Sequence, residues 1–272
     1  MKKKISILMV LTLSIVMLLT ACGSKDATQG TFKVGMEAGY APFNWTQKDN
    51  SNGAVQIEGT SEYAGGYDVE IAKKIAASMN KKLVIVKTEW DGLVPALTSG
   101  KIDAIIAGMS PTAERKKTID FSANYYKSDL VMVVKKGGKY ENAKSIQDFK
   151  GAKITAQLNT FHYTVIDQII GVNKQTAMDN FPAMRVALES GIIDGYVSER
   201  PEGVSASTAN KNFAMVEFTT KFATSDDDTA IAVGVAKGST LTTKINEVLS
   251  GVSEADRKAI MDTAIKNQPA AK

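Results

Sequence analysis

From Thr31 onward, short apolar runs rich in β-branched residues alternate with amphipathic segments. Eight runs predict strands, namely TFKVGM, KLVIVK, DAIIAG, LVMVVKK, AKITAQ, DGYVS, FAMVEF and TAIAVGVAK. Apolar residues at helical spacing predict helices over 67–79, 92–99, 160–170, 181–190, 202–210, 241–251 and 254–266. This alternation is typical of βαβ units, so we expect an α/β fold with parallel sheets.

Two segments refine this pattern. The helix expected over 254–266 starts after Ser253 with Asp256 at the third position, a carboxylate variant of the capping box. The stretch from Gln47 to Gly65 is rich in Asn, Ser, Gly, Asp and Thr and has no clear period. It predicts an inserted loop or an irregular hairpin.

The N-terminus has the profile of a secretory signal. Three lysines precede an apolar stretch from Ile5 to Leu19, which is shorter than the roughly 20 residues of a membrane-spanning helix. The junction LTAC, ending at Cys22, resembles a bacterial lipobox, in which the cysteine is diacylated and the preceding peptide is removed. We therefore expect a signal peptide over 1–21, a lipidated Cys22 and a flexible tether over 22–30. An ordinary signal peptide with an incidental cysteine is the alternative.

The formal charge of +4 belongs largely to that signal. Without Lys2, Lys3 and Lys4 the balance is 30 basic against 29 acidic residues. A nucleic-acid-binding protein normally shows a strong basic excess, so we expect no nucleic-acid partner.

Four segments carry a family resemblance. GYDVEIAKKIAASM (66–79) resembles the signature of the family-3 solute-binding proteins, which serve polar amino acid importers. GMEAGYAPFNW (35–45) and the segment 90–126 resemble the two binding loops of the first lobe, and DGYVSERPE (194–202) resembles the ligand-facing turn of the second. The match covers nearly all of 31–267 in the expected order.

The resemblance implies a type II periplasmic binding protein. In that fold two Rossmann-like α/β lobes are joined by two crossover strands, and the ligand lies between them. Lobe 1 would comprise 31–131 plus 231–272, and lobe 2 would comprise 132–230. The crossovers would lie near 130–134 and 230–235.

The resemblance also implies how an amino acid zwitterion is held. Arg115 matches the arginine that binds the α-carboxylate, a task suited to the planar guanidinium. Glu199 matches the acceptor of the α-ammonium, although many members carry Asp there. Gly108, Ser110 and Thr160 match residues that supply backbone or hydroxyl groups, and Thr160 follows an asparagine where the family often has glycine.

Side-chain selectivity depends on acidic and aromatic positions. Glu37 and Asp68 match acidic residues that, in basic amino acid binders, face the ligand side chain or support the group that does. Asp68 also fits a helix N-terminal carboxylate. Tyr40, Phe43 and Trp90 match aromatic walls that can stack on a cationic stem, but Phe43 and Trp90 also fit core packing. We expect Arg, Lys or His as ligand, with glutamine or another polar amino acid as the alternative.

Other chemistry has weaker support. His162 is the single histidine, has no identifiable Ser or Cys partner, and is interpreted as a helix-face residue near the cleft. The run Asp226-Asp227-Asp228 is interpreted as a solvated loop. We expect no metal, no cofactor and no enzymatic activity. A cyclic-acid dehydratase would need an acid or base in place of the ammonium acceptor, and a sensory ectodomain would need a membrane span.

These features together predict a monomeric lipoprotein anchored on the extracytoplasmic side of the cell membrane. Its partners would be a free amino acid, the permease subunits of an ABC importer and, through the anchor, the membrane.

Overall fold

A computed structural model of the protein describes residues 30–269. The predicted signal peptide, Cys22 and nearly all of the tether lie outside the described residues. From Thr31 onward, the described residues form one compact unit by their own contacts. No helix within 30–269 is long and apolar enough to cross a membrane.

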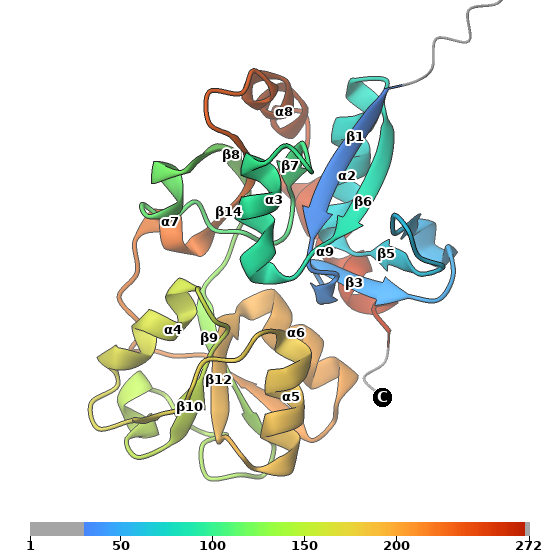
Figure 1. The fold of residues 1–272 in the computed structure, drawn as a ribbon. Helices are drawn as coiled ribbons and strands as arrows, with labels where there is room; N and C mark the ends of the chain where they lie inside the picture. The colour runs from blue at the N-terminus through green and yellow to red at the C-terminus, as the bar shows by residue number, and fades with distance from the viewer. Residues whose placement is uncertain (1–29, 270–272) are drawn as a thin grey trace, which may run out of the picture. The chain divides into compact units, whose positions relative to one another are not determined.

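The first sheet is built from both ends of this unit (Figure 1). Its strand order is β6-β1-β7-β14-β8, where β1 runs parallel to β6 and β7 while β14 is antiparallel to β7 and β8. Helices α2, α3, α8 and α9 belong to this part of the chain. The bounds are β1 (Thr31–Met36), α2 (Tyr67–Ser78), β6 (Lys82–Lys87), α3 (Leu93–Thr98), β7 (Ala104–Ile105), β8 (Ile119–Lys127), β14 (Ala230–Ala236), α8 (Leu241–Ser250) and α9 (Glu254–Asn267).

The second sheet comes from the middle of the chain and has the order β11-β10-β12-β9-β13. Strand β10 runs parallel to β11 and β12, and β9 pairs antiparallel with β12 and β13. Its elements are β9 (Leu130–Lys135), η5 (Ile146–Phe149), β10 (Lys153–Thr155), α4 (Phe161–Val165), η6 (Ile166–Gln168), β11 (Asn173–Lys174), α5 (Phe181–Ser190), β12 (Gly195–Glu199), α6 (Arg200–Ala209) and β13 (Phe213–Val216). We call the parts built on the two sheets lobe 1 and lobe 2.

The chain passes twice between the sheets. It leaves β8 after Lys127 and enters β9 at Leu130, and it returns between Val216 and Ala230. The two passages touch, because the Ser128 N–H donates a 3.0 Å hydrogen bond to the Thr229 carbonyl. The short helix α7 (Asp226–Thr229) lies in the return passage.

The segment predicted as a loop or hairpin is a small antiparallel sheet with the order β2-β3-β5-β4. Its elements are β2 (Gly39–Tyr40), β3 (Asn44–Gln47), η2 (Ser51–Gly53), β4 (Val55–Gln56) and β5 (Tyr63–Gly65). Strand β2 therefore brings Tyr40 to the start of this sheet, directly after the end of β1.

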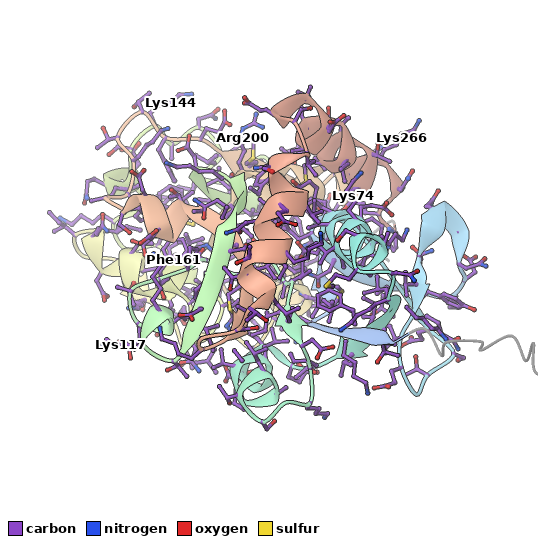
Figure 2. All side chains as sticks on the ribbon, turned by 90° about the horizontal axis from the view of Figure 1, so that it is seen from above. Lys74, Lys117, Lys144, Phe161, Arg200 and Lys266 are labelled. Atoms are coloured by element: carbon purple, nitrogen blue, oxygen red, sulfur yellow. The ribbon has the colours of Figure 1, made fainter. Side chains whose placement is uncertain are left out.

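Buried side chains form two clusters. One fills lobe 1 and continues into lobe 2 through residues such as Val133, Phe181 and Tyr196. The other lies within lobe 2 around Phe149 and Ile154. Lysine side chains such as Lys74, Lys117, Lys144 and Lys266 are exposed, and Figure 2 labels them at separate places on the molecule.

Most of the predicted elements are present, with four main corrections. The sheets are mixed and not parallel throughout, because β14 in one and β9 in the other run antiparallel to both of their neighbours. Strand β8 was not predicted, because Ile119–Lys127 mixes polar and aromatic residues. The helix expected over 160–170 is a five-residue α4 followed by the single turn η6. The acidic run at 226–228 is not a loop but the first turn of α7, in which Ser225 and Asp228 form a capping box. The capping box of Ser253 and Asp256 is confirmed.

Candidate ligand-binding site

The predicted binding residues follow the carboxyl ends of strands from both sheets. Glu37 follows β1, Trp90 starts the turn η3 (Trp90–Gly92) soon after β6, and Gly108 follows β7. In lobe 2, Thr160 lies after β10 and Glu199 ends β12. Parallel strands bring their carboxyl ends to one edge, where ligands of open α/β sheets bind.

A small pocket joins these edges. Seven of the ten predicted residues line it together with three others, and the complete lining is Tyr40, Trp90, Gly108, Ser110, Arg115, Gln157, Thr160, Phe161, His162 and Glu199. The free volume is about 10 Å³, which holds about one water molecule. In this conformation the side chains of the site therefore contact one another.

Arg115 begins the 3-10 turn η4 (Arg115–Lys117) and reaches both lobes. Its Nη1 donates to the Ser110 carbonyl at 3.0 Å and its Nη2 to the Asn159 carbonyl at 3.1 Å. The guanidinium carbon lies 5.0 Å from the centre of the Trp90 ring. Burial lowers its pKa to about 10, against the opposing effect of Glu199 and Asp228. The group is thus a cation at neutral pH whose hydrogen-bond partners are neutral carbonyls.

Glu199 is the opposing charge and is 2% exposed. Tyr40 donates a short hydrogen bond from its hydroxyl to Oε2, and His162 Nε2 lies 3.0 Å from Oε1. The His162 contact has an ion-pair distance but not the angle of a hydrogen bond. Burial raises the pKa of Glu199, but His162 and Tyr40 outweigh it, so the pKa lies below its usual value. Glu199 is therefore an ionised carboxylate.

Glu37 lies behind the pocket wall. Its Oε2 accepts a 3.0 Å hydrogen bond from Gln157 Nε2, and its Oε1 has no hydrogen-bond partner among the described residues. Burial raises the pKa to about 7, the Gln157 hydrogen bond opposes this, and the charges of Glu89 and Asp91 add to it. A cation that reaches the Glu37 carboxyl would stabilise its ionised form.

Phe43 and Asp68, also predicted, do not line the pocket. Phe43 packs against Tyr40 with ring centres 5.0 Å apart. Asp68 accepts hydrogen bonds from Asn44 at 2.8 Å and from the Tyr125 hydroxyl at 2.7 Å. Phe43 therefore supports the pocket residue Tyr40. Asp68 supports Gly108 through Tyr125, whose hydroxyl also accepts the Gly108 N–H at 3.3 Å.

Two backbone positions fix the pocket wall. Gly108 has φ +62°, and a Cβ there would lie 2.7 Å from the Tyr40 ring. Only glycine allows this close approach. Asn159, where the family often has glycine, also has a positive φ of 55°, which asparagine tolerates. Its side chain donates to Asp91 at 2.9 Å, which is a further contact between the lobes.

The sequence did not identify Gln157, Phe161 and His162 as site residues. Gln157 carries no charge, and α4 is too short to show a periodic face. The signal available for His162 was that the one histidine of the chain lies two residues after Thr160. Its proximity to Glu199 is a contact across the sheet that sequence spacing does not reveal.

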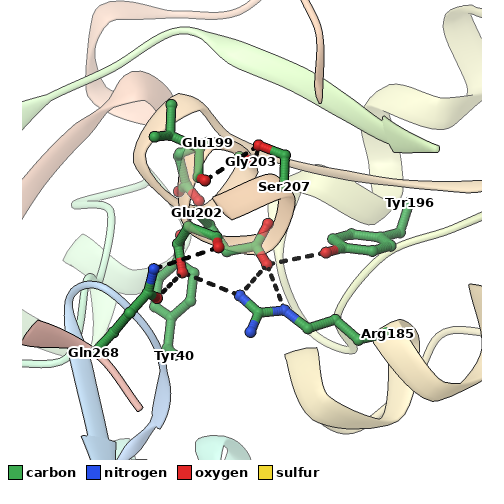
Figure 3. A network of polar contacts seen from close by, with 10 residues as sticks. Tyr40, Arg185, Tyr196, Glu199, Glu202, Gly203, Ser207 and Gln268 are labelled. Carbon is green, nitrogen blue, oxygen red and sulfur yellow. Dashed lines mark hydrogen bonds and ion pairs between the residues drawn. The ribbon is translucent and has the colours of Figure 1, made fainter. Parts of the chain in front are cut away.

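A second arginine–glutamate pair lies beside the pocket (Figure 3). Glu202 is fully buried, and its Oε1 accepts from Arg185 Nη2 at 2.8 Å and from the Tyr196 hydroxyl at 3.0 Å. Ser205 accepts from Arg185 at 3.3 Å and also bonds Gln268, beyond the end of α9. This network ties lobe 2 to the C-terminal segment.

The chain belongs to a known protein family. Residues 32–263 match the bacterial extracellular solute-binding proteins, family 3. This membership agrees with two α/β sheets whose carboxyl-terminal edges share one pocket.

Individual relatives agree with this assignment. The chain is 34% identical over 188 residues to a protein named as a probable histidine-binding protein of Campylobacter jejuni, covering 64% of this chain. It is 29% identical to the ABC transporter glutamine-binding protein GlnH of Bacillus subtilis, covering 98% of this chain and 99% of that one. The first match spans 66% of the relative's length, and matches to two arginine-binding relatives span 56% and 51% of theirs.

Among solved structures, the chain resembles the amino acid ABC transporter substrate-binding protein AbpA of Streptococcus pneumoniae, determined with bound L-arginine. The TM-score is 0.74 at 25% identity, covering 87% of this chain and 95% of that chain. The fold is therefore that of a type II periplasmic binding protein.

Proposed function

We propose that the protein is the substrate-binding component of an amino acid ABC importer and that it binds the zwitterion of a cationic amino acid between its lobes. The observation that carries this proposal is the placement of Arg115 and Glu199 on opposite lobes of one pocket, unpaired with each other. An α-carboxylate fits the guanidinium and an α-ammonium fits the carboxylate, because neither charge tolerates unpaired burial.

Ligand entry requires opening of the site. A free volume of about 10 Å³ cannot admit an amino acid. The two adjacent passages between the sheets, at 127–130 and 216–230, form the hinge in our proposal, and lobe 1 moves against lobe 2. Ligand contacts on both lobes would favour the closed state, which the permease subunits would recognise.

Preference for a cationic side chain is supported by three groups. Trp90 and Tyr40 provide aromatic faces in the pocket. Beyond Tyr40, Glu37 keeps one buried oxygen without a hydrogen-bond partner among the residues of the described range. A guanidinium or ammonium at this position would supply both a donor and a countercharge.

Glutamine is the second candidate. A carboxyl group with a pKa of about 7 is partly protonated at neutral pH, so Glu37 can also exchange hydrogen bonds with a neutral amide. The full-length similarity to a glutamine-binding relative favours the same alternative.

The remaining parts of the proposal follow from family membership and from residues outside the described range. We propose a monomeric lipoprotein without catalytic activity, anchored through acylated Cys22 on the extracytoplasmic face of the cell membrane. Incorporation of labelled palmitate into the native chain, and its loss in Cys22→Ala, would test the anchor.

The ligand is tested by a thermal-shift screen of residues 23–272 against the twenty amino acids. A ligand at a hundredfold excess over its dissociation constant adds about 2.7 kcal/mol to the apparent stability. We expect stabilisation by arginine, lysine or histidine. Stabilisation by glutamine alone would overturn the cationic preference, and no stabilisation by any amino acid would overturn the proposed function.

A further inference from the structure

Glu199, the proposed ammonium acceptor, already has a counter-ion within the protein. His162 Nε2 lies 3.0 Å from Oε1, and both side chains are at most 5% exposed. Neither ring nitrogen of His162 has a hydrogen-bond partner within 30–269 that would hold it in another orientation. Its ring packs against Phe161 with centres 4.3 Å apart.

The charged and titratable groups around His162 are few. Glu199 faces it from β12, Tyr40 from β2 and Arg115 from η4, all lining the same pocket. Glu37 is one residue further away, behind Gln157. Asp167, on η6 after α4, pairs with Lys174 at 2.9 Å. Glu199 is thus the anion that contacts the imidazole.

A bound amino acid would change this balance. Its α-carboxylate is matched by Arg115, so its α-ammonium needs the charge of Glu199. A protonated His162 at 3.0 Å from Glu199 would compete for that charge and repel the ammonium. If protonated His162 and the α-ammonium both stayed beside the buried Glu199 carboxylate, their mutual repulsion would make binding less favourable.

We propose that His162, as a positioning residue, is an internal counter-ion that stands in for the ligand. In its protonated form it holds Glu199 in the unliganded site, and the α-ammonium displaces it. The imidazole then gives one proton to solvent and remains neutral. This inference rests on the proposed function of the pocket.

Part of the pH dependence of the affinity should therefore arise from His162. Histidine is the side chain whose charge normally changes between about pH 5 and 8. If binding releases one proton, the dissociation constant of L-arginine rises by up to about tenfold for each pH unit of acidification in this range.

The direct experiment is proton NMR of the imidazole in an untagged protein, titrated from about pH 5 to 8.5 with and without saturating L-arginine. A chain with one histidine gives one imidazole signal set. We expect saturation with L-arginine to move its titration to lower pH by roughly one unit or more, the equivalent of a tenfold effect. The same titration in both states would overturn the inference.

Calorimetry with L-arginine over the same range supplies the control. In His162→Gln the amide can still donate to Glu199 but cannot carry a charge. Binding of L-arginine should therefore release one proton fewer than in the native protein. Glu37→Gln is the matched variant, because Glu37 also titrates near pH 7. The Glu37→Gln variant should retain the part of the pH dependence of L-arginine binding that is due to His162.

The outcomes separate the two proposals. An unchanged pH dependence in His162→Gln, with tight binding of L-arginine, would overturn the role of His162 alone. No binding of any amino acid by the native protein would instead contradict the proposed function.

Discussion

Two arginine–glutamate combinations lie near each other, one within lobe 2 and the other with one residue on each lobe, and they differ in whether the two charged groups contact each other. Arg185 and Glu202 contact each other at 2.8 Å, and Tyr196 and Ser205 join this network through further hydrogen bonds, while Glu202 Oε2 has no hydrogen-bond partner among the described residues. Arg115 and Glu199 do not pair with each other, and Arg115 donates to backbone carbonyls. A buried pair in direct contact fixes structure, whereas separated charges of opposite sign leave capacity for a ligand.

Removing Arg185 should have the largest effect on stability. Arg185→Ala leaves Glu202 buried without its countercharge, and breaking a buried pair typically costs about 3–5 kcal/mol. Chemical denaturation of the unliganded protein would measure the loss. Arg200→Ala is the control, because its partner Glu217 is more than half exposed and such pairs contribute at most about 1 kcal/mol. Equal losses in both variants would contradict the distinction.

Removing Arg115 should affect ligand affinity more than the stability of the unliganded protein. Arg115→Ala should weaken binding of L-arginine by about 2–5 kcal/mol, because the ligand carboxylate loses its partner. The stability of the unliganded protein should change far less. Titration calorimetry and denaturation of the same samples measure both quantities. The neighbouring Lys116→Ala, which removes an exposed pair with Asp227, should bind normally.

Glu37→Gln should change selectivity more than affinity for the zwitterion. Loss of a hydrogen bond to a charged group costs about 1.5–3 kcal/mol, so the preference for arginine over glutamine should shrink by that amount. Competition binding with the two amino acids measures it. Asp68→Asn is the control, because Asp68 bonds Asn44 and Tyr125 rather than lining the pocket. A larger effect in Asp68→Asn would place the selective carboxylate there.

Glu37 should also contribute to the change of protein stability with pH. Its pKa is raised from 4.5 to about 7 in the folded protein, chiefly by burial, so the folded state binds a proton that the unfolded state has lost. The contribution to stability is complete below about pH 4.5 and is lost as the pH rises through about 7, by at most about 1.4 kcal/mol per pH unit. The free energy of unfolding, measured by denaturation from pH 4.5 to 7.5, should change less with pH in Glu37→Gln than in the native protein. An equal change of the unfolding free energy with pH in the native protein and in Glu37→Gln would contradict the raised pKa of Glu37.

The regions that were predicted best carry local signals. Strands such as TFKVGM and the capped helix after Ser253 follow from short-range patterns, and both are present. Strand β8 escaped prediction because IDFSANYYK owes its conformation to pairing with β14, more than 100 residues later. Non-local pairing of this kind leaves little trace in periodicity.

The candidate site shows the same division. Arg115 and Glu199 were predicted through motifs that resemble a family, and the fold brings both to one pocket. His162 was interpreted as a helix-face residue near the cleft, and what the sequence lacked was its contact with a carboxylate 37 residues away. Asp68 is distinguished from Glu37 by its complete set of hydrogen bonds, which only the structure reveals.

The most direct test of the zwitterion site is a calorimetric comparison of L-arginine with agmatine on the native protein. Agmatine keeps the guanidinium and an amine but lacks the α-carboxylate, so it cannot satisfy Arg115. We predict that agmatine binds at least about 30-fold more weakly, the equivalent of about 2 kcal/mol or more. Equal affinity for the two compounds would contradict the assignment of Arg115 and the pocket as the site of the amino acid.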